Sequence, residues 1–97
     1  MNRNRNVLKW SSNETENHIN MKFNICKYLK KMGKEFYTEA ILVGGKGRAD
    51  IINADDAVIY EVVQTESQKS LQLKAKKYPL EVRFVKANQE FNEKLLQ

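Results

Sequence analysis

The sequence lacks any long apolar run. No stretch approaches the roughly 20 apolar residues that a helix needs to cross a bilayer, and the N-terminus, MNRNRNVLKW, has no apolar core of the kind found in signal peptides. Cysteine is almost missing as well, since Cys26 stands alone and leaves no disulfide framework within the chain. Together with the single His18, it is too little for a Cys/His zinc site. We therefore expect a cytoplasmic, intracellular protein that does not span a membrane.

The composition predicts one globular domain. At 97 residues the chain can bury a single core but not two, and its 41% apolar and 30% charged residues are typical of a folded protein. The formal net charge of +5 attracts polyanions but does not by itself identify a partner. We divide the chain into a basic N-terminal arm over residues 1–12 and a domain over residues 13–97.

The arm has two interpretations. Met1–Asn6 is expected to be a frayed tail, while Val7, Leu8 and Trp10 fold back onto the core. Alternatively, the arm contacts a phosphate backbone through its basic residues, which are Arg3, Arg5 and Lys9.

Two helices are indicated by capping residues and apolar periodicity. The first starts at a cap from Ser11, Ser12 or Asn13, with Glu14 or Glu16 as the reciprocal partner, and ends at Gly33. Its apolar stripe at helical spacing consists of Ile19, Phe23, Cys26, Leu29 and Met32. The second starts at a Thr65 cap with Gln68 as its partner and ends before Pro79.

The remaining segments predict strands and complete an α/β architecture. Residues 34–43 alternate as a strand does, and two β-branched runs, Ala49–Asn53 and Ala57–Val63, form a hairpin. Residues 80–86 form a fourth strand, parallel to the second strand of the hairpin because a helix connects them, and residues 90–97 form a short closing helix. The predicted order is α-β-β-β-α-β-(α), with a mixed central sheet between helices.

Each strand of the hairpin carries a carboxylate where alternation predicts an apolar residue. These are Asp50 and Glu61, which can lie side by side on one face of the sheet if the strands pair as antiparallel neighbours. Two adjacent carboxylates repel each other and resist burial, but a divalent cation between them reverses that balance. The sequence therefore suggests a metal site. In the alternative interpretation, Asp50 caps a loop and Glu61 pairs with a lysine at a strand edge.

This element order resembles the core of the PD-(D/E)xK nuclease superfamily, which includes restriction enzymes and archaeal Holliday junction resolvases. The resemblance covers roughly residues 13–86 and rests on Gly47-Arg48-Ala49-Asp50-Ile51 and Tyr60-Glu61-Val62-Val63. It implies a restriction-endonuclease-like three-layer sandwich that hydrolyses phosphodiester bonds in DNA rather than RNA, as an endo- or exonuclease and as a homodimer. It also implies that Mg²⁺ or Mn²⁺ is bound by Asp50, Glu61 and the carbonyl of Val62, with Glu14 or Glu16 as a third acid.

The sequence departs from the family pattern at the lysine two residues after the second acid, where Val63 stands. Either the cation has moved, to Lys69 or to Lys46 or Arg48, or the core no longer cuts. In the first case, Asp50, Glu61 and Lys69 are the catalytic residues. Phosphate contacts without base reading are then expected from the basic side chains Lys46, Arg48, Lys74 and Lys76. In the second case, the protein is a catalytically silent nucleic-acid-binding protein or a structural, interaction module of the kind that viruses or plasmids encode.

Overall fold

The computed structural model describes residues 5–42, 44 and 47–97. The chain is α/β, with a mixed four-stranded sheet and two helices, and the elements follow in the predicted order. Their bounds are α1 (Glu16–Lys31), β1 (Phe36–Ile41), β2 (Arg48–Asn53), β3 (Val58–Val63), α2 (Gln68–Lys77), β4 (Glu81–Lys86) and the 3₁₀ helix η2 (Glu93–Leu96). The sheet order is β1-β2-β3-β4, antiparallel from β1 to β3 and parallel between β3 and β4.

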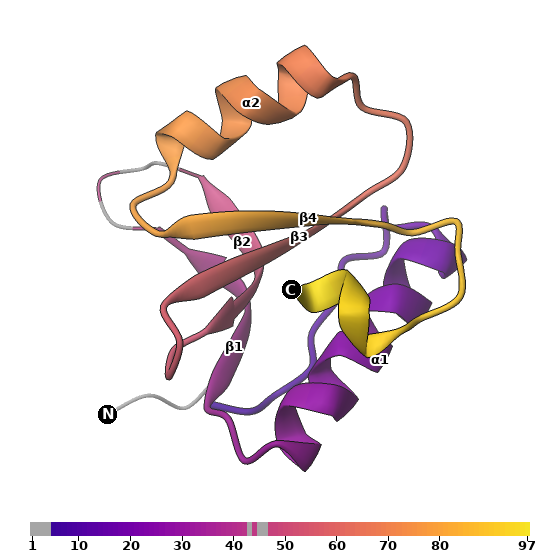
Figure 1. Ribbon diagram of the computed structural model, residues 1–97, viewed down its shortest axis with the longest axis vertical. Helices are drawn as coiled ribbons and strands as arrows, with labels where there is room; N and C mark the ends of the chain where they lie inside the picture. Colours follow the sequence, from indigo (N-terminus) through magenta and orange to yellow (C-terminus); the bar gives the residue numbers. More distant parts are fainter. Residues whose placement is uncertain (1–4, 43, 45–46) are drawn as a thin grey trace.

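The sheet lies between the two helices, with α1 on one side and α2 on the other (Figure 1). Under α1, a core forms from helix residues such as Ile25 and Leu29 and from sheet residues such as Ile51 and Val62. On the α2 side, a smaller cluster is built from Leu42, Ala49 and Ile59, with Tyr78, Leu80 and Val82 packed against it. Because both faces are covered, all six residues of β3 are buried, as expected for a central strand in a layered α/β protein.

Both helix caps differ from the predicted ones. The N-cap of α1 is Thr15, whose hydroxyl accepts the His18 N–H at 3.2 Å, whereas the predicted caps lie in the turn before it. In that turn the Ser11 N–H donates to Glu14 at 2.5 Å, so the turn closes locally and the helix begins later. In α2 the N-cap is Ser67 rather than Thr65. The end of α2 before Pro79 is confirmed.

The N-terminal segment lies along β1, which corrects part of the prediction of a frayed tail. The Asn6 N–H donates to the Phe36 carbonyl, and the Phe36 N–H donates to Asn6 Oδ1, both at 2.8 Å. Further along, the Lys9 N–H donates to Thr38 Oγ1 at 2.9 Å. These bonds satisfy backbone groups of an edge strand that would otherwise be open. Leu8 packs on the core as predicted, but Trp10 remains 55% exposed.

Within the described ranges, no helix has the length and apolar character that a membrane crossing requires.

Candidate functional site

The β2–β3 ladder changes character where the two acids face each other. Regular pairing, with Ile51 opposite Tyr60, fixes a register that brings Asp50 opposite Glu61. There, side chains replace the backbone ladder: the Val62 N–H donates to Asp50 Oδ2 at 2.8 Å, and the Asp50 N–H donates to Glu61 Oε2 at 2.6 Å. Each carboxylate thus binds the backbone of the other strand. Both side chains are held by rigid sheet, which is the kind of support a precise site needs.

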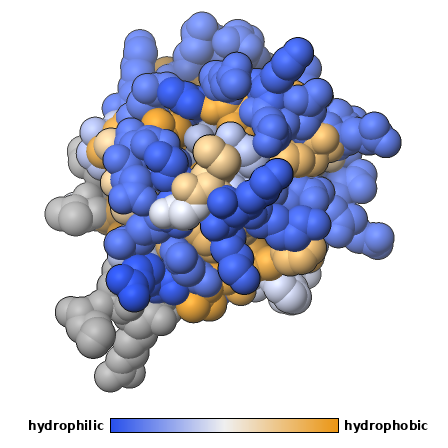
Figure 2. All heavy atoms as spheres, turned by 60° about the horizontal axis from the view of Figure 1, so that its bottom comes forward, coloured by the Kyte–Doolittle hydropathy of each residue, from blue (hydrophilic) through white to orange (hydrophobic). Residues whose placement is uncertain are grey.

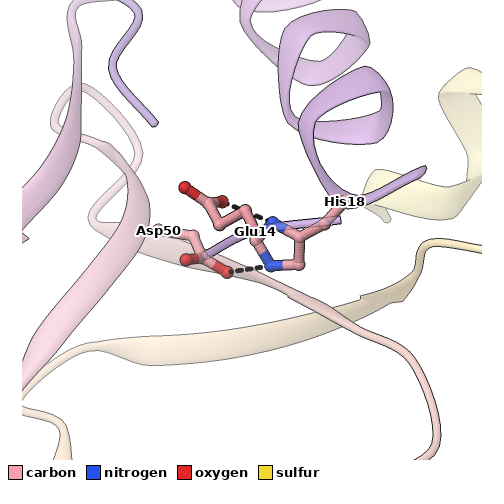
Figure 3. Close-up of side chains that lie close together, drawn as sticks. All are labelled: Glu14, His18 and Asp50. Carbon is pink, nitrogen blue, oxygen red and sulfur yellow. Dashed lines mark ion pairs between the residues drawn. The ribbon is translucent and has the colours of Figure 1, made fainter. Parts of the chain in front are cut away.

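The Asp50 carboxylate lies on the α1 side, near His18 in the first turn of that helix and Glu14 in the turn that precedes its N-cap. The imidazole of His18 lies between the carboxylates of Glu14 and Asp50 (Figure 3). Its Nδ1 is 2.5 Å from Glu14 Oε1, and its Nε2 is 3.4 Å from Asp50 Oδ2 and 2.9 Å from the Val62 carbonyl oxygen. Glu14 and His18 are spaced i, i+4, which aligns their side chains. One ligand atom from each of the three residues lies within 4.8 Å of the others.

The surroundings of His18 favour its charged form. The hydrogen bond to Asp50 is the main cause that raises the pKa of His18 above its ordinary value of 6.5, and burial opposes this increase. The charges of Asp50 and Glu14 and the Val62 carbonyl act in the same direction as the hydrogen bond. In its charged form, His18 lies between two carboxylates that both favour the charge.

We predict that the metal-free protein loses stability as the pH rises above about 6.5. Because the pKa of His18 is raised on folding, the stability it contributes is fully present below 6.5 and is lost as the pH rises through the folded value. Since the chain has one histidine, its ring signals in an NMR titration report this pKa without ambiguity. Urea unfolding in EDTA from pH 5 to 8 should show the decline, and His18→Gln should flatten it. A titration midpoint below 6.5 would contradict the prediction.

The Glu61 carboxylate is directed to α2, where Lys74 and Tyr78 bind it, whereas the Asp50 carboxylate contacts α1 on the other side of the sheet. The predicted arrangement of both carboxylates on one face of the sheet is therefore not observed. Lys74 Nζ is 2.8 Å from Glu61 Oε1, and the Tyr78 hydroxyl donates to the same oxygen at 3.3 Å. Burial and then the charge of Asp50 raise the pKa of Glu61, and the hydrogen bond from Lys74 opposes this. Burial acts to lower the pKa of Lys74, but its bond to Glu61 prevails and raises it. Burial also raises the pKa of Tyr78 to about 12, so its hydroxyl is a stable donor.

A buried lysine supports the Glu14 side of the site. Lys22 is fully buried, with Nζ 2.8 Å from Glu39 Oε2 and 3.4 Å from Glu14 Oε1. Glu39 stands opposite Asp50 by strand register and has φ at +50°, a left-handed conformation that is uncommon for residues other than glycine. Glu39 also pairs with the exposed Arg48 at 3.6 Å. The ammonium of Lys22 thus holds the Glu14 carboxylate in position.

The predicted site residues are distributed around this centre. Asp50, the Val62 carbonyl and Glu14 come together, but the three-residue cluster contains His18 and not Glu61; binding of one ion by both Asp50 and Glu61 stays a prediction. Glu16, Lys69 and Lys76 are exposed on the helices. The lysine of α2 that contacts Glu61 is Lys74, which the sequence had suggested for phosphate contacts. Lys46 lies outside the described residues.

Sequence reasoning missed the roles of His18 and Lys22, although a signal was present. Neither residue belongs to the predicted apolar stripe, yet they are spaced i, i+4 and continue towards Ile25 and Leu29 on the buried side of α1. A lysine on the buried side of a helix either extends its ammonium group to solvent or pairs that group with a carboxylate in the interior. Only the position of Glu39 across the sheet edge decides between these outcomes.

Comparisons of the chain with protein-family models, with curated proteins and with solved structures gave no match. The kind of metal that the cluster can bind is therefore inferred from its ligand atoms. Two carboxylates and one imidazole, beside a backbone carbonyl, form a mixed nitrogen and oxygen set. Such a set suits Mn²⁺ and other first-row ions better than Mg²⁺, which prefers oxygen ligands alone. The residues fit a divalent ion if His18 gives up its proton, as metal binding requires.

Proposed function

We propose that this protein is a metal-dependent nuclease that hydrolyses phosphodiester bonds in DNA on a restriction-endonuclease-like fold. The single observation that supports the proposal best is the exchange of hydrogen bonds at the point where the regular ladder stops: the Asp50 N–H donates to the Glu61 carboxylate, and the Val62 N–H donates to the Asp50 carboxylate. It fixes a carboxylate beside the Val62 carbonyl, within reach of a second acid and a histidine. Ordinary structural ion pairs do not need two acidic residues at neighbouring positions of adjacent strands.

In this proposal, Glu14, His18 and Asp50 hold the ion together with the Val62 carbonyl. A bound Mn²⁺ or Mg²⁺ would supply Lewis acidity, which polarises a phosphate ester and makes a water molecule easier to deprotonate. Asp50 is oriented by the Val62 N–H, and His18 closes the site from the helix side. The raised pKa of Glu61 suits a carboxylate that accepts a proton.

In this proposal, Lys74 supplies the positive charge of the motif lysine, whose position Val63 occupies. Its ammonium lies 2.8 Å from Glu61 Oε1, and its side chain is 41% exposed to solvent. A fixed positive charge at this point offsets the negative charge that develops on the phosphoryl oxygens. Because α2 follows β3 directly, the chain can supply this charge one element later than the motif position.

The alternative function is a catalytically silent protein that binds nucleic acid. One observation favours it: without an ion, the Asp50 and Glu61 carboxylates and the Val62 carbonyl already have partners, because His18 contacts the first and third and Lys74 contacts the second. Such a protein retains basic surfaces and shifts DNA in a gel with strong salt dependence, but leaves it uncut. The homodimer implied by the family resemblance stays a prediction.

The proposal is tested by replacing Lys74 and Lys69 separately by methionine. With plasmid and branched DNA in Mn²⁺, we expect Lys74→Met to lower the cleavage rate about a hundredfold, on the scale of losing one transition-state donor. Lys69→Met should cut like the parent protein, because Lys69 is exposed on the same helix. The measurement is the initial rate of loss of supercoiled plasmid, with Mg²⁺ and EDTA as parallel conditions.

The two variants form a matched pair, since each removes one lysine from α2 and the same charge from the protein. If both cut at the parental rate, Lys74 has no part in the reaction. If the parent protein leaves every DNA substrate intact in Mn²⁺ but still binds it, the silent alternative replaces the nuclease. A rate that depends on Lys69 alone would restore the cation suggested by the sequence.

A further inference from the structure

A polar stripe on α1 borders a groove that the proposed chemistry does not use. Asn17, Asn20, Asn24, Lys27 and Lys31 follow one another at i, i+3 and i+4 steps, which aligns them on one side of the helix. At a rise of 1.5 Å per residue, the stripe is about 21 Å long. It begins at Asn17, in the same first turn of α1 that carries His18.

The loop between β4 and η2 forms the opposite wall of this groove. The loop passes along α1 (Figure 1), and Asn17 Nδ2 donates to Asn88 Oδ1 at 2.9 Å across the end nearest the site. The first part of the groove, about 470 Å³, is lined by the four carboxamides of Asn17, Asn20, Asn24 and Gln89 together with Met21, Ala87, Glu90 and Phe91. A second part of about 240 Å³ shares Asn24 and Phe91 and adds Lys27, Tyr28 and Lys31. The groove thus passes from amides to an aromatic ring and then to lysines.

The asparagines of this wall have no evident structural purpose. Asparagine is a poor residue for a helix interior, and alanine at the same position is better. Asn20 and Asn24 nevertheless occupy the middle of α1, and neither side chain forms a hydrogen bond to any residue in the described part of the chain. The side on which α1 lies is mainly hydrophilic, with separate apolar side chains (Figure 2). A polar ligand fits this surface better than an apolar one.

The lining matches the chemistry of a single nucleic-acid strand. A carboxamide donates and accepts at once, as the edge of a base does, and asparagine forms paired bonds with adenine in particular. Phosphates only accept, so they are expected at Lys27 and Lys31 and away from Glu90 and Glu93 on the loop side. The half-buried ring of Phe91 offers a base a stacking surface.

We propose that this groove binds single-stranded DNA by its bases and delivers the strand to the metal site. The inference deepens the proposed nuclease function and rests on it for the direction of the strand. Asn20 and Asn24 are positioning residues for the substrate: they hold bases, and they do not touch the reacting phosphate. Base reading in the groove complements the phosphate contacts suggested by the lysines of α2.

The test is the affinity of the full chain for a fluorescein-labelled 12-nucleotide strand, measured by anisotropy in EDTA so that no cleavage occurs. The double change Asn20→Ala and Asn24→Ala is expected to raise the Kd about tenfold or more, as the loss of two or three hydrogen bonds does. Gln72→Ala, which removes an exposed carboxamide from α2, is the matched control and should leave the Kd unchanged. Since alanine favours helix, weaker binding by the double variant cannot be ascribed to unfolding.

An abasic strand of equal length separates base contacts from phosphate contacts. The parent protein should bind it more weakly than the normal strand, and this difference should be smaller in the double variant, which retains only the stacking on Phe91. Equal affinity of parent and double variant for the normal strand would overturn the inference, as would an equal loss for both strands. Failure of the nuclease proposal would look different: a protein that never cuts DNA but binds bases through Asn20 and Asn24 would support the groove and contradict the nuclease activity.

Discussion

Replacing Asp50 by asparagine is expected to lower the rate of Mn²⁺-dependent DNA cleavage at least about a hundredfold, on the scale of other single groups that act electrostatically in a transition state. Asp50 is the shared member of both halves of the site, because its carboxylate touches His18 and its N–H binds Glu61. Removing its charge weakens metal binding and leaves His18 without its main ionic partner. We also expect the pKa of His18 to fall towards 6.5, since Asp50 is the chief cause of its increase.

The asparagine variant retains the fold. Its side-chain oxygen can still accept the Val62 N–H, and the Asp50 charge that raises the pKa of Glu61 is gone. Urea unfolding in EDTA should therefore show a stability within about 1 kcal/mol of the parent protein, the value of one ordinary hydrogen bond. A folded Asp50→Asn protein that cuts at the parental rate would falsify the metal site. A protein that fails to fold would show that the carboxylate is structural, and Asp50→Glu then tests whether a displaced charge restores cutting.

Replacing Lys22 by methionine is expected to lower the free energy of unfolding by about 3–5 kcal/mol, the usual cost of removing one partner of a buried ion pair. Lys22 is completely buried, and its ammonium lies between Glu39 and Glu14, which are 15% and 13% exposed. Methionine fills most of the space of the lysine stem but removes the buried cation between the two carboxylates, which leaves Glu39 with the exposed Arg48 and Glu14 with His18. The loss should show as a lower urea midpoint in chemical denaturation.

The second change Glu39→Gln should restore part of the stability lost in Lys22→Met. The glutamine removes one of the stranded charges, so the two losses are not additive, as expected for residues in contact. Lys30→Met is the control on the same helix: Lys30 is exposed near its C-terminus, and the change should cost less than about 1 kcal/mol. If Lys22→Met costs no more than Lys30→Met, the buried pair contributes nothing to the fold, and Glu14 does not need it for its position.

Much of the fold could be predicted from the sequence because the signals are local. Alternation indicated the strands, apolar spacing indicated α1, and Pro79 indicated where α2 stops, since each depends on residues within one or two turns. The parallel pairing of β3 with β4 followed from a helix between them. The caps were predicted at the wrong residues because several hydroxyl and amide side chains compete before each helix, and a short-range pattern does not choose between Ser11 and Thr15 or between Thr65 and Ser67.

The sequence by itself determined that Asp50 and Glu61 stand on neighbouring strands, because the hairpin between them is short enough to set the register. Only the tertiary structure decided what each carboxylate meets: His18 and Glu14 for Asp50, and Lys74 for Glu61. Those partners come from helices 32 residues or more before Asp50 and 13 residues after Glu61, and the way the helices pack on the sheet selects them. Local periodicity indicated a helix but gave its buried side only in part, since Phe23 and Met32 of the predicted stripe are exposed. The atoms that meet in the core depend on the register and tilt of whole elements.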